Sequence, residues 1–179
     1  IAMEDVRREL MAQAAKMERT GLPLTHVDSH QHMHMLPGVI DISLDVAASL
    51  HLDAVRISRT PLFTAFAGMG QLIGRLGLFT LSELSLWKAK RRHFRVPDHF
   101  EGIVAGEAVH EGHFLHILKD LRPGTTEVMM HPGTDNSRLI PACDWEHDFE
   151  AEMQAIVSPK VRRMIADKAV KVVNYRDLK

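Results

Sequence analysis

Histidine and aspartate alternate with other residues through one short segment of this chain. From residue 26 to residue 34 the sequence reads HVDSHQHMH, which spaces five polar side chains two residues apart: His26, Asp28, His30, His32 and His34. In an extended strand, residues two apart point to the same face, so one edge would carry four imidazoles and a carboxylate. An apolar core would penalise these groups unless each had a partner. The fold is therefore expected to place this edge in a polar cleft at the carboxyl end of a strand.

The rest of the chain alternates between helical and extended patterns. Hydrophobic spacing predicts helices near residues 4–19, 38–50, 107–121, 145–156 and 159–167. Short apolar runs predict strands near residues 22–29, 54–58, 102–106, 125–131 and 170–175. This order favours an α/β fold with a parallel sheet, either an open layer or a closed barrel. We expect a single domain over residues 1–179.

The region 61–95 is predicted to be a helical insertion in that domain. One helical stretch, Leu62 to Leu76, contains three glycines, and a second runs from Leu81 to Arg92. Glycine is unfavourable inside a helix by about 1 kcal/mol relative to alanine. The apolar residues of this region are suited to covering a cleft, contacting a lipid-linked substrate or forming a homodimer contact, and the sequence does not choose among these roles.

Composition excludes several classes of protein. The chain has 179 residues, 45% of them hydrophobic, and a formal net charge of −1, so no overall positive field would attract nucleic acid. The only cysteine, Cys143, rules out an internal disulfide and fits a reducing compartment. No apolar run reaches the length of a membrane span, and we expect no signal peptide. We expect a cytoplasmic protein that acts on a small molecule.

Imidazole and carboxylate side chains in this pattern indicate a metal site. Both are preferred ligands of Zn²⁺ and similar divalent ions. Neighbouring same-face residues of a strand lie about 6–7 Å apart, so two of the five side chains can reach one ion. The others would orient ligands, contact substrate or transfer protons. A second histidine series, His110, His113 and His116, is interpreted as a solvated helix face because its flanking residues are also polar.

The segment THVDSHQHMHMLPGV (25–39) closely resembles the central motif of the YdjC-like carbohydrate deacetylases. VRISRTPL (55–62) is similar to the arginine-containing strand and loop of that family, and EVMMHPG (127–133) to its late strand ending in His-Pro. The tail through SPKVRRM to VVNYRDL has the family's closing pattern. The resemblance spans nearly the whole chain, and the middle region is similar to the branch associated with hopanoid biosynthesis.

This resemblance implies a metal-dependent N-deacetylase with a (β/α) barrel-like fold. The family begins with an Asp-Asp-Phe-Gly strand and a later Gly-x-His segment, and neither occurs here. The chain, which opens with Ile1, is therefore expected to be the carboxyl-terminal two-thirds of such a barrel, with an incomplete metal site and no activity alone. By motif position, His30 is the remaining ligand of a divalent ion, Mg²⁺ or Zn²⁺.

Further roles follow for the other polar residues. The substrate implied is a small N-acetylated sugar or oligosaccharide. His131, at the end of a predicted strand, is a candidate proton donor or substrate contact, and Asp28 is a candidate catalytic residue that orients a neighbouring imidazole. The candidate substrate-binding residues are His32, His34, Arg56 and Arg59; for the two arginines a surface ion pair is an equal alternative.

Two other interpretations remain open from the sequence. An amidohydrolase-type barrel also uses a His-x-His pair, but on its first strand, whereas here a full helix precedes the motif. A non-catalytic metal-binding module with a vestigial site is the second alternative. Metal binding without acetate release by the complete protein would favour that module.

Overall fold

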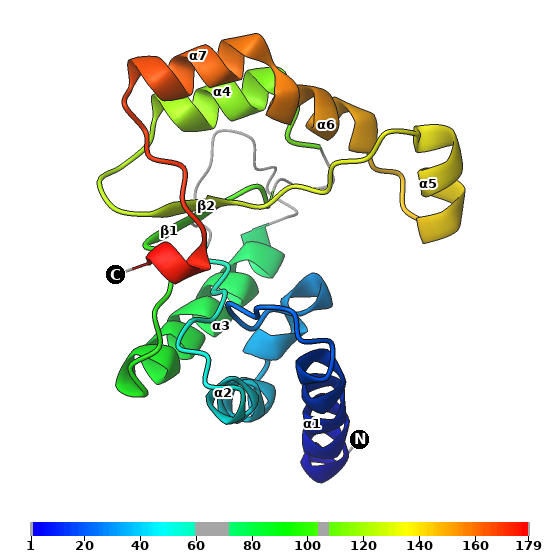
Figure 1. Ribbon diagram of the computed structural model, residues 1–179, viewed down its shortest axis with the longest axis vertical. Helices are drawn as coiled ribbons and strands as arrows, with labels where there is room; N and C mark the ends of the chain where they lie inside the picture. Colours follow the sequence, from blue (N-terminus) through cyan, green and yellow to red (C-terminus); the bar gives the residue numbers. More distant parts are fainter. Residues whose placement is uncertain (1, 60–71, 104–107, 179) are drawn as a thin grey trace. The chain divides into compact units, whose positions relative to one another are not determined.

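The computed structural model describes residues 2–59, 72–103 and 108–178, which form two compact units (Figure 1). The first unit contains the described residues 2–59, 72–98 and 173–178. The second contains the described residues 99–103 and 108–172. The single domain expected over the whole chain therefore stays a prediction. Within the described residues, no helix combines the length and the apolar character needed to cross a membrane.

The first unit is mainly helical. Its elements are α1 (Met3–Glu18), the 3₁₀ turn η1 (His30–Met35), α2 (Val39–Ser49), α3 (Leu72–Arg91) and the 3₁₀ turn η3 (Tyr175–Asp177). Three extended segments run beside these helices and meet at single parallel bridges. Val27 pairs with Val55, and Ala54 pairs with Arg95. The polar segment 26–34 thus begins in extended backbone, as expected, but the predicted strands at 22–29 and 54–58 are reduced to bridges.

Helix α2 organises the core of the first unit because it is apolar on two faces. Ile40, Leu44 and Ala47 recur at helical spacing and pack into one buried cluster with Val55 of the bridge and other residues. Ile42 and Val46 point into a second cluster with α1. The full burial of the Leu44 side chain by itself contributes about 1.5–3 kcal/mol to folding. This packing supports the extended segments that carry the candidate site.

The second unit contains a βαβ arrangement. Its elements are β1 (His99–Glu101), α4 (Glu111–Lys119), β2 (Thr126–Val128), α5 (Asn136–Cys143), α6 (Phe149–Val157) and α7 (Pro159–Asp167). β1 and β2 pair in parallel, with His99 opposite Thr126 and Glu101 opposite Val128. Helix α4 connects the strands and packs against α6 and α7 (Figure 1). The described residues thus confirm a mixed α/β fold with a small parallel sheet.

Several predicted elements differ from the structure. The strand predicted at 102–106 is displaced, since β1 ends at Glu101 and residues 104–107 lie outside the described residues. Within 61–95, the described residues from 72 onward form one helix rather than the end of one and the start of another. Much of the predicted helix Leu62 to Leu76 lies outside the described residues. The strand predicted at 170–175 is wrong: Val172 is 76% exposed there and the chain enters η3.

Helix α5 was not predicted at all. The helix, Asn136–Cys143, follows Gly133 and contains Pro141, and both residue types are uncommon inside helices. The Asp135 side chain caps the helix by accepting a hydrogen bond from the backbone N–H of Arg138. Pro141 lacks the N–H that would continue the helical hydrogen bonding, and the helix ends two residues later at Cys143.

We expect Gly102→Ala to destabilise the second unit. Gly102 has a φ of +100°, and a Cβ there would lie 2.2 Å from the carbonyl oxygen of Met129, which follows β2. Strained backbone and steric overlap act together, so the free energy of unfolding should fall by about 2–4 kcal/mol. Urea unfolding followed by circular dichroism measures this change.

Gly77→Ala is the matched control. Gly77 is exposed in α3, and a Cβ there meets nothing within 4 Å. Alanine should stabilise this helix by about 0.5–1 kcal/mol. A Gly102→Ala variant as stable as the wild-type protein would contradict the close approach to Met129.

Candidate functional site

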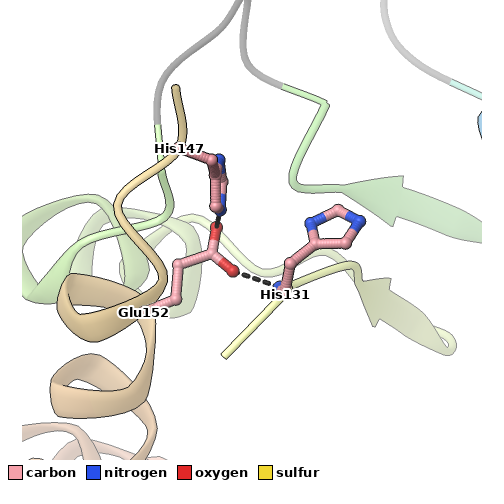
Figure 2. A group of neighbouring side chains, drawn as sticks. All are labelled: His131, His147 and Glu152. Atoms are coloured by element: carbon pink, nitrogen blue, oxygen red, sulfur yellow. Dashed lines mark hydrogen bonds and ion pairs between the residues drawn. The ribbon is translucent and has the colours of Figure 1, made fainter. Parts of the chain in front are cut away.

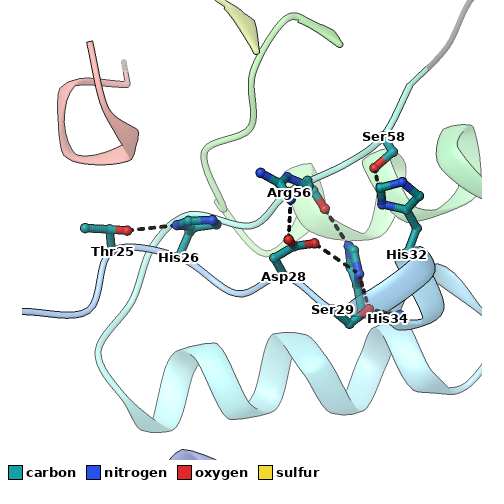
Figure 3. A network of polar contacts seen from close by, with 8 residues as sticks. All are labelled: Thr25, His26, Asp28, Ser29, His32, His34, Arg56 and Ser58. Carbon is teal, nitrogen blue, oxygen red and sulfur yellow. Dashed lines mark hydrogen bonds and ion pairs between the residues drawn. The ribbon is translucent and has the colours of Figure 1, made fainter. Parts of the chain in front are cut away.

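The histidine segment leaves the extended conformation at Ser29. Ser29 itself is extended, with φ −148° and ψ 157°, but Gln31 and His32 have φ values of 51° and 57°. These two residues lie in the left-handed region, which costs free energy for residues other than glycine. The regular alternation expected from the sequence is therefore wrong beyond Ser29, and the four histidines do not line one edge. His30 begins the turn η1. His32 and His34 lie within it, and His26 precedes it (Figure 3).

Buried His34 holds this turn together. The Ser29 hydroxyl accepts a hydrogen bond from the His34 backbone N–H and lies 2.8 Å from Nδ1 of the same residue. The other ring nitrogen, Nε2, lies 2.7 Å from the carbonyl oxygen of Arg56. These contacts are satisfied together when the hydroxyl donates to Nδ1 and a neutral ring donates from Nε2. Burial penalises the charged ring and lowers the pKa of His34 below its ordinary value of 6.5.

Asp28 and Arg56 form an ion pair beside this ring. The guanidinium of Arg56 donates to one carboxylate oxygen of Asp28, and the other oxygen lies 3.9 Å from Nδ1 of His34. The second distance is longer than a hydrogen bond. Asp28 thus lies near the imidazole that it was expected to orient, and its hydrogen bond in this network comes from Arg56 (Figure 3).

The other histidines of the segment have different environments. His32 Nδ1 lies 2.7 Å from the hydroxyl of Ser58, a fully buried residue that follows the bridge. His26 contacts the Thr25 hydroxyl at 2.8 Å and stacks on Tyr175, with ring centroids 3.6 Å apart. His30, the first residue of η1, is exposed to solvent. Its role as a metal ligand is untested by this geometry.

Arg59 lies at the end of the described part of this segment. Its side chain forms an ion pair with Glu83 of α3, and both groups are partly exposed. A surface ion pair was one of the two roles considered for it. This ion pair does not test whether Arg59 binds the sugar, so that role stays a prediction.

His131 lies in the second unit, three residues after β2 (Figure 2). It is exposed, and its ring meets the ring of Trp145 edge to face, with centroids 5.0 Å apart. Its backbone N–H donates to a carboxylate oxygen of Glu152, a residue of α6. The position after the strand agrees with the expectation from the sequence, and the anchoring carboxylate was not anticipated.

Two residues near His131 were missed in the sequence. Glu152 is 1% exposed, and its other carboxylate oxygen accepts a hydrogen bond of 2.9 Å from the backbone N–H of Val109. His147, 5% exposed, has Nε2 3.2 Å from that same oxygen. A signal for Glu152 exists in the sequence, because it lies three residues after Phe149 on the face of α6 where apolar side chains are expected. We find no comparable signal for His147.

Comparisons with known proteins relate this chain to one family and to carbohydrate deacetylases that resemble it. The profile of a family described as YdjC-like protein matches residues 1–167. A carbohydrate deacetylase of Thermoanaerobacter pseudethanolicus is 27% identical over 177 residues, covering 99% of this chain and 61% of the relative. A mouse carbohydrate deacetylase is 29% identical over 203 residues, covering 99% of this chain and 63% of the relative. The chain therefore spans about three fifths of the length of these relatives.

A solved structure resembles this chain in fold. It comes from Enterococcus faecalis and is named for cellobiose-phosphate cleavage. Its TM-score is 0.67 at 18% identity, and the match covers 98% of this chain and 61% of that one. At this identity the likeness concerns the fold alone.

We expect acid to destabilise the protein through His34. Because burial lowers the pKa of His34 in the folded state, the unfolded chain binds a proton near pH 6.5 before the folded chain does. The stability contributed by the neutral ring is present above pH 6.5 and is lost as the pH falls below it, by at most about 1.4 kcal/mol per pH unit.

Urea unfolding between pH 5 and pH 8 measures this effect in the wild-type protein and in His34→Gln. The variant should be less stable at pH 8 and should lose less stability on acidification. His116→Gln, a change at an exposed position of α4, serves as the control. The same pH dependence in His34→Gln and in the wild type would show that burial of this imidazole is not the cause.

Proposed function

The chain belongs to the YdjC-like protein family, and we propose that the protein removes an acetyl group from an N-acetylated sugar or oligosaccharide. The observation that carries this proposal is the agreement of relatives: the bacterial and mouse proteins that match 99% of this chain are both named carbohydrate deacetylase. The family match over residues 1–167 supports the same conclusion. The complete fold is proposed to be the barrel-like form, of which the described residues contribute parallel strands and helices.

Hydrolysis of an acetamido group sets three chemical requirements. A water molecule must be activated, the oxyanion of the tetrahedral intermediate must be stabilised, and the leaving amine must receive a proton. We propose that His131 supplies that proton or contacts the substrate. Its exposed ring supports this role, and the hydrogen bond from its backbone N–H to Glu152 fixes the chain from which the ring projects.

In the first unit, the turn at η1 is proposed to present polar side chains to the sugar. Left-handed backbone at Gln31 and His32 is costly, and it persists because hydrogen bonds of Ser29 and His34 hold the turn. Since both ring nitrogens of His34 are hydrogen-bonded inside the protein, we assign it a positioning role. His32 and Arg56 remain candidates for contacts with sugar hydroxyls, as does Arg59.

A divalent ion is part of the proposal, with His30 as one ligand. Such an ion would polarise the amide carbonyl and lower the pKa of a bound water. In the part of the chain that the structure describes, however, no group of three metal-binding side chains includes His30. The described residues alone do not make a complete site there. We therefore assign no step of the reaction to an ion at His30, and the metal, Mg²⁺ or Zn²⁺, is left to experiment.

The proposal is tested by acetate release from N-acetylated chitooligosaccharides. The assay uses this chain and the longest natural protein that contains it. We expect the long form to be active, to lose activity on treatment with EDTA, and to regain it with Mg²⁺ or Zn²⁺. The 179-residue chain is expected to be inactive alone.

In the long form, His30→Ala should reduce kcat/KM by about 100-fold or more, because a metal ligand contributes more than the 10–100-fold typical of its supporting partners. His116→Ala, at the exposed surface of α4, is the control and should retain wild-type activity. Full activity with alanine at position 30 would exclude the ligand role. Metal binding by the long form without any acetate release would favour a non-catalytic module.

A further inference from the structure

The most unusual buried group in the second unit is the imidazole of His147. Its side chain is 4% exposed, and within the described parts of the chain neither ring nitrogen has a hydrogen-bond partner. Trp145 stacks on the ring with centroids 4.1 Å apart, and Phe149 meets it at 4.9 Å. These aromatic side chains hold the orientation in which Nε2 faces Glu152. A buried imidazole whose ring nitrogens make no hydrogen bond is costly unless something else binds it.

The carboxylate of Glu152 has capacity for a further partner. An ionised carboxylate offers about four lone-pair positions on its two oxygens. Two are used by backbone N–H groups, that of Val109 on one oxygen and that of His131 on the other. The oxygen that faces Val109 also faces Nε2 of His147 at 3.2 Å. A cation between these two side chains would satisfy the imidazole nitrogen and neutralise the buried charge.

His131 completes a set of three. The side chains of His131, His147 and Glu152 each offer a ligand atom, and these atoms lie within 4.8 Å of one another (Figure 2). In a tetrahedral site with bonds near 2.1 Å, ligand atoms are about 3.4 Å apart. The contact between His147 and Glu152, at 3.2 Å, already has this separation. A change of rotamer at the exposed His131 ring would bring in the third ligand.

We propose that His131, His147 and Glu152 bind a Zn²⁺-class divalent ion. Two imidazoles and one carboxylate are a donor set that zinc uses with one position left for water. Mg²⁺ prefers oxygen ligands in octahedral geometry and is a poor match for two nitrogens. Two of the ligands are buried and one is exposed, so the open position would face solvent on the side of His131.

This site is distinct from the one proposed at His30 and does not depend on the proposed deacetylation. It does constrain the role of His131, because a ring nitrogen bound to an ion is not available to donate a proton. If the ion occupies the nitrogen that faces substrate, Zn²⁺ added beyond the amount that restores activity should slow the reaction. The alternative for the buried pair is an ion pair of His147 and Glu152 without metal.

Metal titration of the 179-residue chain tests the proposal. The variants are made in a His30→Ala, Cys143→Ser background, which removes the other proposed ligand and the exposed thiol. Co²⁺ is added while its visible absorption is recorded, and Zn²⁺ is then used to displace it. We expect one ion per chain, bands typical of a tetrahedral site, and loss of affinity by about 100-fold or more in His147→Gln and Glu152→Gln.

Matched variants decide between the outcomes. His116→Gln should bind as the background does. Glu152→Gln removes a charge that accepts two backbone N–H groups and can weaken the fold, whereas His147→Gln leaves those hydrogen bonds in place. Circular dichroism verifies that each variant is folded. Absence of stoichiometric binding, or equal affinity in folded His147→Gln, would overturn the site and leave the ion pair as the role of these residues.

Discussion

The hydrogen bonds of a single buried imidazole determine the shape of the candidate site in the first unit. His34 connects the Ser29 hydroxyl on one side to the carbonyl oxygen of Arg56 on the other. These contacts hold η1 against the bridge formed by Val27 and Val55. Together with the contact of His32 with Ser58 and the burial of Met35, they offset the cost of left-handed backbone at Gln31 and His32. The exposed position of His30 and the contact of His32 with Ser58 both follow from this turn.

The second unit uses a buried carboxylate in a comparable way. Glu152 connects the segments that follow the two parallel strands, accepting from Val109 before α4 and from His131 after β2. A buried carboxylate that accepts backbone N–H groups resists rearrangement, because breaking either bond leaves an unpaired polar group in the interior. His147 lies against the same carboxylate and adds an imidazole that no other described side chain satisfies. Glu152 therefore supports the fold and is also one of the three ligands that we propose for a divalent ion.

The family assignment and the geometry answer different questions. Relatives named carbohydrate deacetylase indicate the class of reaction. The structure indicates which side chains reach solvent: His30 and His131 are exposed, whereas His34 has both ring nitrogens engaged inside the protein. Histidines of one evenly spaced motif can thus have different roles: His30 faces solvent, whereas His34 holds the turn.

Local sequence determined four of the helices. Apolar spacing placed α1, α2, α6 and α7 close to their observed bounds, because helical hydrogen bonds and face patterns depend on residues at most four positions apart. The histidine motif likewise determined the family and the residue types of the site. Only the tertiary structure decided where the extended backbone stops, because Arg56, which accepts from His34, is 22 residues away along the chain. It also decided which backbone groups the buried Glu152 carboxylate binds, since Val109 is 43 residues from Glu152. Strand pairing and the burial of polar groups depend on such distant partners, so no periodicity in the local sequence predicts them.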